Sequence, residues 1–326
     1  MERNKSIDGL KYLLIILVIV GHFIEPSRYN NIISCHTYSF IYSFHMPLFI
    51  MLNGYLYRKR QLKEEIKKCT PLLEVCILSH ILFAILKYGE LSYDNMIDFS
   101  FTPSWYLLSL VCWRIQSSVL AYYFSDKKIL ILSITIEIIS FLLFTIYGGT
   151  FSIMRTMQFY PFFMIGYFLK KNAKHTITKY AKSLYYASMF AIIYILITSC
   201  RLQHQCFFER AGLLELSNFT KHGLLWLYIF RYSLILSSLF ISLSIFLISQ
   251  NNRVVCMLSK YGKSTLFIFY GQTLIYPLAT KYCTTISTSL ILSALSIIIL
   301  TKISYYPMSE VLMTPITYIK RILNKY

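Results

Sequence analysis

Residues 8–25 read DGLKYLLIILVIVGHFIE, an apolar run long enough for a bilayer-crossing helix, which needs about 20 mostly apolar residues. Asp8 and Lys11 stand near its start and His22 near its end. At 100° per residue, eleven positions return a helix to within about 20° of its starting direction, so Lys11 and His22 share one stripe, about 16 Å apart. Asp8 lies one turn before Lys11 on that stripe and can form an ion pair with it.

Ten such runs predict an all-α fold, a polytopic transmembrane helical bundle of about ten spans in one integral-membrane domain over residues 1–326. The composition agrees, because 56% of the residues are hydrophobic and 14% are charged, whereas soluble proteins carry about 25% charged residues. This composition excludes a water-soluble enzyme. The predicted spans are 8–25, 37–57, 70–87, 104–123, 129–147, 151–169, 183–200, 223–249, 262–280 and 287–306.

The net charge of +18 arises from 32 Lys and Arg residues against 14 Asp and Glu residues. The basic residues lie in short clusters between apolar runs, as in cytoplasmic loops, so nucleic acid is not an expected partner. Clusters at 58–68, 170–182 and 253–263 fall on the side of the N-terminus, and the acidic segment 88–103 falls on the other. We therefore predict a multi-pass protein of the plasma (cytoplasmic or inner) membrane with both termini cytoplasmic.

Polar side chains inside spans are costly and are functional candidates by default. His45 stands in the second run just before Pro47, and Arg114 lies deep enough in the fourth to need an anionic partner or ligand. The structural alternative is that such groups pair with one another between helices. Further ionisable residues inside the runs are Glu74, His80, Glu137, Arg155 and Arg231.

The eight cysteines form no CxxC or zinc-type spacing, so no metal site is predicted. Four of them fall on the predicted outer side, which leaves a disulfide among them open. These are Cys35, Cys200, Cys206 and Cys283.

Sequence blocks spread over nearly the whole chain resemble one family. They are RNKSIDGLK (3–11) with Gly21-His22, SFHMPLF (43–49) with NGY (53–55), TPSWYLL (102–108) with Trp113-Arg114, PFFMIGY (161–167) and YGKSTL (261–266). In this order they resemble the acyltransferase 3 family of bacterial membrane O-acyltransferases, which includes fucose 4-O-acetylase-like proteins. That family places an Arg or Lys, then ten residues, before a histidine, and Lys11 with His22 matches.

The chain departs from the family pattern at three places. Many members have a second arginine three residues from Arg114, which is absent here. Gln272 stands where a histidine often follows the YGKSTL block, and Asn53 stands where a serine is commoner.

The resemblance implies transfer of an acetyl group from cytoplasmic acetyl-CoA, a co-substrate rather than a permanently bound cofactor, to a carbohydrate hydroxyl at or beyond the outer face. The acceptor would be a lipid-linked sugar or a polysaccharide of the O-antigen or capsule type. His22 is the expected general base, with Lys11 and Asp8 completing the catalytic set. Expected to hold the acyl-CoA are Lys11, Arg114 and Arg155, and expected to bind the acceptor are His45, Asn53, Trp105 and Tyr106.

The lipid bilayer is a further expected partner, and a homodimer is compatible with the sequence. Two other functions remain open. A transporter or flippase of lipid-linked sugars would also be polytopic and basic, but would not consume acyl-CoA. A catalytically inactive sensor of the same fold would bind sugar without forming an ester. Trp105 and Tyr106 also have a structural alternative as aromatics of the membrane interface.

Overall fold

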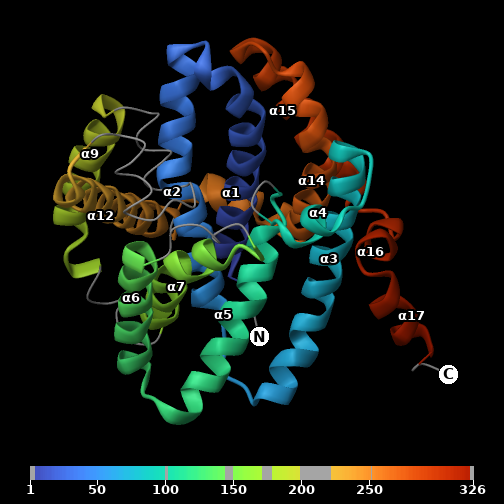
Figure 1. The fold of residues 1–326 in the computed structure, drawn as a ribbon, viewed down its shortest axis with the longest axis horizontal. Coiled ribbons are helices and arrows are strands. Elements are labelled where there is room, and N and C mark those ends of the chain that lie inside the picture. Colours follow the sequence, from blue (N-terminus) through green and yellow to red (C-terminus); the bar gives the residue numbers. More distant parts are fainter. Residues whose placement is uncertain are drawn as a thin grey trace.

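The computed structural model describes residues 4–99, 102–143, 150–170, 178–198, 222–250 and 252–323. Within them the regular elements are helices, accompanied by one isolated bridge between Asp98 and Thr150, which confirms the predicted all-α class (Figure 1). The elements are α1 (Lys5–Ile24), η1 (Glu25–Tyr29), α2 (Ile32–Leu56), α3 (Leu62–Tyr88), α4 (Tyr93–Ile97), α5 (Trp105–Tyr123), α6 (Asp126–Leu143), α7 (Ile153–Phe168), α9 (Ala181–Ile197), α12 (Leu224–Ser249), α13 (Arg253–Leu258), η4 (Ser259–Tyr261), α14 (Thr265–Tyr282), α15 (Ile286–Ile303), α16 (Met308–Met313) and α17 (Pro315–Leu323).

Each of the ten apolar runs overlaps a helix in this set. Four stretches of the described chain are long and apolar enough to cross a membrane. The count of about ten spans and the cytoplasmic side of both termini stay predictions. Residues 201–221 of the predicted outer loops lie outside the described residues. The four stretches are Lys5–Tyr29, Leu62–Tyr88, Leu224–Ser249 and Ile286–Ile303.

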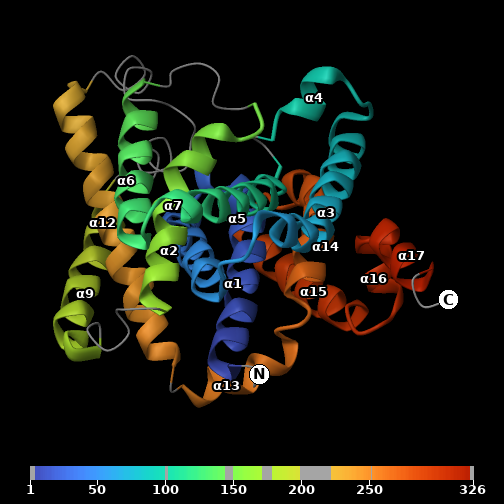
Figure 2. The ribbon, with the colours of Figure 1, turned by 90° about the horizontal axis from the view of Figure 1, so that it is seen from below.

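Helix α1 lies at the centre of the molecule, in contact with α2, α13, α14 and α15 (Figures 1 and 2). The side chain of Asn4 begins it by accepting a hydrogen bond from the backbone N–H of Ile7, which satisfies one of the free donors at a helix start. Ile15 and Ile19 are completely buried. This central position surrounds the polar residues of α1 with neighbouring helices.

The crossing of α2 with α7 requires two glycines. A Cβ on Gly54 would overlap the carbonyl oxygen of Phe163, and a Cβ on Gly166 would overlap that of Met51. The two backbones therefore approach each other on both sides of the crossing, as small residues permit between membrane helices. Gly54 and Gly166 are therefore close-packing residues that fix α2 against α7.

Two buried carboxylates tie helices together. Glu137 on α6 accepts a hydrogen bond from Arg231 on α12 at 3.0 Å and one from the Tyr232 hydroxyl at 2.9 Å. Glu74 on α3 accepts the hydroxyl of Thr317 at 2.6 Å and its N–H at 3.1 Å, which holds the start of α17. Glu137 and Arg231 therefore follow the structural alternative, in which buried charges pair with one another, whereas the donors to Glu74 are neutral.

Cys35, near the start of α2, is disulfide-bonded. Cys283 is a free, buried thiol, and Cys200 and Cys206 lie outside the described residues.

Candidate active site

His22 lies in the last turn of α1, facing α2 and α14. Its Nδ1 is 3.2 Å from the Tyr42 hydroxyl and 3.7 Å from Oε2 of Glu25. The ring of Tyr276 packs against it edge-on, with 4.8 Å between centroids. The side chain is 18% exposed, and among the described residues Nε2 has no hydrogen-bond partner. One ring nitrogen therefore faces a phenol and a carboxylate, and the described residues offer no hydrogen-bond partner to the other.

Glu25, the first residue of η1, joins three elements at this site. Its Oε2 accepts the hydroxyl of Tyr276 at 2.9 Å, and its Oε1 lies 3.5 Å from Nη1 of Arg28. Arg28 in turn packs over the ring of Tyr38, 4.5 Å from the centroid. The carboxylate beside His22 is thus fixed from α14 and η1, which orients the histidine ring.

His45 lies deeper along α2 than Tyr42. Its Nδ1 is 2.8 Å from the carbonyl oxygen of Ile41, and its ring packs edge-on against Tyr42 with centroids 4.7 Å apart. Tyr42 therefore contacts both His45 and His22. His45 is buried, so its ring contacts Tyr42 from the interior of the helix bundle.

The ion pair predicted between Asp8 and Lys11 is confirmed, with 3.9 Å between Nζ and Oδ1. Gly262, from the YGKSTL block, lies against Asp8, where a Cβ would be 2.6 Å from the Asp8 Cβ. The block thus packs on the first turns of α1. This pair and His22 lie near opposite ends of that helix.

Four other predicted residues, on α2, α5 and α7, form two pairs. Asn53 donates a hydrogen bond to the Tyr106 hydroxyl at 2.6 Å. The guanidinium of Arg155, at the start of α7, lies 5.1 Å from the centre of the Trp105 ring at the start of α5, a cation–π distance. The fold therefore brings Asn53 to Tyr106 and Trp105 to Arg155.

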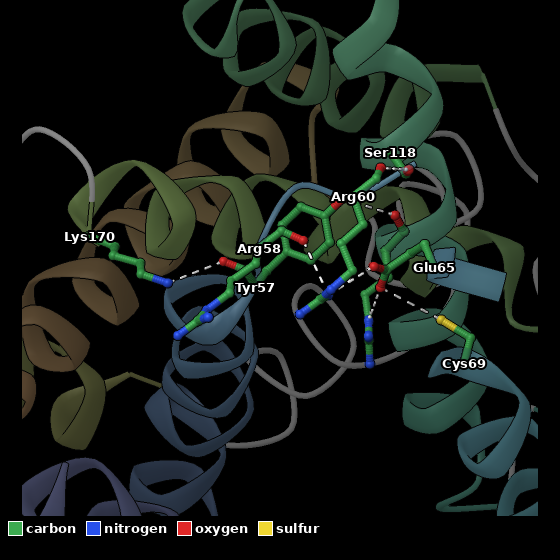
Figure 3. A network of polar contacts seen from close by, with 8 residues as sticks. Tyr57, Arg58, Arg60, Glu65, Cys69, Ser118 and Lys170 are labelled. Carbon is green, nitrogen blue, oxygen red and sulfur yellow. Dashed lines mark hydrogen bonds and ion pairs between the residues drawn. The ribbon is translucent and has the colours of Figure 1, made fainter. Parts of the chain in front are cut away.

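Arg114 has an anionic partner, as its depth in α5 predicts. The partner is Glu65, in the first turn of α3, whose completely buried carboxylate accepts from Nε of Arg114 at 2.6 Å and from Nη1 of Arg60 at 3.0 Å (Figure 3). Nearby, Lys59 pairs with Asp126 at 3.0 Å. We name the following residues the Glu65 cluster: Arg58, Lys59, Arg60, Glu65, Arg114, Asp126 and Lys170.

Sequence reasoning missed four residues here. Glu25 had a local signal, since it follows His22 by three positions and so falls on the same face of a helix. Glu65 stood out only as an acid within a basic segment. Tyr42 and Tyr276 gave no signal, because their contacts with His22 join helices far apart in sequence.

The structure therefore places a phenol at 3.2 Å and a carboxylate at 3.7 Å from the same ring nitrogen of His22. The three cations expected to hold the acyl-CoA have different partners. Lys11 pairs with Asp8 on α1, Arg114 with Glu65, and Arg155 packs on Trp105.

Comparisons with known proteins agree with this architecture. The family described as an acyltransferase domain matches residues 4–308. Nodulation protein NolL of Sinorhizobium fredii is 26% identical over 183 residues, or 51% of this chain and 48% of that protein, so the chain spans about half the length of this relative. No solved structure matches the chain. Because the family match covers nearly all of its residues, the chain belongs to the acyltransferase 3 family.

Proposed function

We propose that this protein is a membrane O-acyltransferase that moves an acetyl group from cytoplasmic acetyl-CoA to a hydroxyl of a cell-surface or lipid-linked carbohydrate. The proposal rests on the contacts of the His22 ring. Its Nδ1 faces Tyr42 and Glu25, and its Nε2 is unoccupied within the described chain. The proposed role requires the tautomer of His22 in which Nδ1 carries the proton and Nε2 offers the lone pair.

The reaction needs one base and balances without a further reactant. Nε2 of His22 takes the proton of the sugar hydroxyl as its oxygen bonds to the thioester carbonyl carbon. The tetrahedral intermediate then breaks its carbon–sulfur bond, and the departing thiolate receives the proton back from His22. The products are an acetyl ester and free coenzyme A.

Of the two arginines expected to hold the acyl-CoA, Arg155 is the better candidate for stabilising the oxyanion. Arg114 is committed to the buried carboxylate of Glu65. Arg155 instead packs on the ring of Trp105, a residue expected to bind the acceptor. A cation near the developing oxyanion lowers the barrier to acyl transfer.

The aromatic residues on α5 suit a carbohydrate acceptor. Trp105 is half-buried beside Arg155, and Tyr106 is held by Asn53. An indole ring offers an apolar face next to a polar edge, which complements the C–H face and hydroxyls of a sugar ring. His45 would support this site through Tyr42.

Two observations support an outer position for His22. The disulfide at Cys35 is typical of an oxidising compartment, and Cys35 begins the helix that meets η1. The basic segment 58–68 follows the other end of the same helix, where cytoplasmic charge is expected. Both agree with a plasma-membrane protein whose termini are cytoplasmic.

The test uses purified protein in lipid nanodiscs, radiolabelled acetyl-CoA and a crude extract of cell-surface glycans. We expect label in alkali-labile esters, its loss in His22→Ala, and retention in the control His36→Ala. Glycan binding without ester formation in the unaltered protein would favour a transporter or sensor. Full transfer by His22→Ala would remove His22 from its proposed role.

A further inference from the structure

The Glu65 cluster lies at the end of α2 away from His22, where the chain passes into α3. Fifteen positions separate Tyr42 from Tyr57, about 22 Å along a helix axis. Figure 1 shows the turn between α1 and α2 at the top and the start of α3 at the bottom. The cluster and the His22 site are therefore connected by one helix but separated by most of its length.

The cluster carries five cations and two carboxylates. Glu65 neutralises part of the charge of Arg60 and Arg114, and Asp126 pairs with Lys59. The Glu65 cluster as a whole therefore keeps a net positive charge. Like charges held together cost free energy, which an anionic ligand with several charges would relieve.

Arg58 and Lys170 form the exposed edge of the cluster. The ammonium of Lys170, just after α7, donates to the carbonyl oxygen of Tyr57 at 3.4 Å. Partial burial, and after it the cations of Arg58 and Arg60, lower the pKa of Lys170. Figure 3 shows Lys170, Arg58 and Arg60 grouped around Tyr57.

The backbone that presents these cations is held in place from α5. The hydroxyl of Ser118 donates to the carbonyl oxygen of Arg60 at 2.7 Å, and that of Tyr57 donates to the carbonyl oxygen of Arg114 at 3.4 Å (Figure 3). Glu65 fixes the two guanidinium groups from inside. The cations are thus ordered before any ligand arrives, which reduces the entropy lost on binding.

We propose that the Glu65 cluster binds the phosphate groups of the coenzyme A donor, with Arg58 and Lys170 contacting the 3′-phosphate. The inference rests on the proposed acyl transfer and adds to it the place where the donor is held. Arginine forms paired hydrogen bonds to phosphate, and lysine adds a point charge. The thioester arm then extends along α2 toward His22.

The test is a calorimetric titration of the full-length protein in neutral phosphatidylcholine nanodiscs with coenzyme A and with dephospho-coenzyme A, which lacks the 3′-phosphate. We expect Arg58→Ala and Lys170→Ala each to weaken coenzyme A binding about tenfold, the effect of one charged hydrogen bond. Dephospho-coenzyme A binding changes much less. Lys68→Ala, which removes an exposed cation from the same end of α3, leaves both affinities unchanged.

Unchanged coenzyme A affinity in both variants would overturn the proposal. An anionic lipid headgroup offers the same phosphate chemistry and is distinguished by lipid analysis. If Arg58→Ala lowers the phosphatidylglycerol that copurifies with the protein while leaving coenzyme A binding intact, the cluster is a lipid site and the proposal is wrong.

The titration needs no acceptor and no turnover, so it separates the two proposals. A protein that binds coenzyme A through the cluster but forms no ester contradicts only the acyl-transfer proposal. A protein that forms ester, with variants that bind coenzyme A normally, contradicts only the donor site.

Discussion

Around His22 the charges nearly balance, with Glu25 facing Arg28, whereas the Glu65 cluster about 22 Å along α2 holds five cations against two carboxylates. The first region consists mainly of a histidine and phenols, which exchange protons. The second consists mainly of guanidinium and ammonium groups, which bind anions. Under the two proposals, proton transfer and donor binding lie at opposite ends of α2, so mutations at the two ends should change different kinetic constants.

Glu25→Gln gives the largest effect among variants that spare His22 itself. The amide keeps the size of the side chain but removes the charge that faces Nδ1 of His22. We expect kcat for acetyl transfer to fall about 10- to 100-fold, less than loss of the base itself, because Tyr42 still holds the ring.

The measurement is initial rate against acetyl-CoA concentration, with Glu90→Gln as an exposed control on the predicted outer side. A raised KM with unchanged kcat would mean that Glu25 acts in binding and that the two ends of α2 are not separated as described.

Glu65→Gln tests whether the positive cluster depends on its buried anion. Removing the charge leaves Arg60 and Arg114 without their shared carboxylate. We expect the free energy of unfolding to fall by about 1–3 kcal/mol, seen as a lower thermal midpoint in detergent. Glu64→Gln makes the same change at the exposed neighbouring position. Equal midpoints in the two variants would show that the cluster holds together without Glu65.

Lys170→Arg is expected to give the smallest effect, a change in coenzyme A affinity that depends on pH. Because burial and neighbouring cations lower the pKa of Lys170, it loses its proton at a lower pH than an ordinary lysine. Coenzyme A affinity should therefore fall several-fold on the alkaline side in the unaltered protein. Arginine stays charged, so Lys170→Arg should keep its affinity there.

The titration compares this variant with Lys68→Arg, whose pH dependence should match that of the unaltered protein. Identical alkaline losses in Lys170→Arg and Lys68→Arg would remove Lys170 from the donor site.

The helices were predictable because the apolar runs are local features of the sequence. Periodicity within α1 also predicted the pair of Asp8 and Lys11, since a helix fixes the relation between residues three apart. Arg114 was predicted to need an anion, but its partner Glu65 could not be chosen, because α3 and α5 meet only through the tertiary fold.

The surroundings of His22 show the same limit. Glu25 is its neighbour in sequence, whereas Tyr42 and Tyr276 reach it from α2 and α14. Because the surfaces of most of these helices are apolar, the sequence does not determine which helix faces pack against each other. Polar partners across helices become visible only once the packing is known.

One experiment tests both proton transfer by His22 and donor binding by the Glu65 cluster. It measures kcat, KM for acetyl-CoA and coenzyme A affinity together in His22→Gln and Arg58→Ala. We expect His22→Gln to lower kcat about 100-fold or more and to leave coenzyme A affinity unchanged. We expect Arg58→Ala to raise KM for acetyl-CoA about tenfold and to leave kcat unchanged. Undiminished kcat in His22→Gln, or lowered kcat with an unchanged KM in Arg58→Ala, would contradict these assignments.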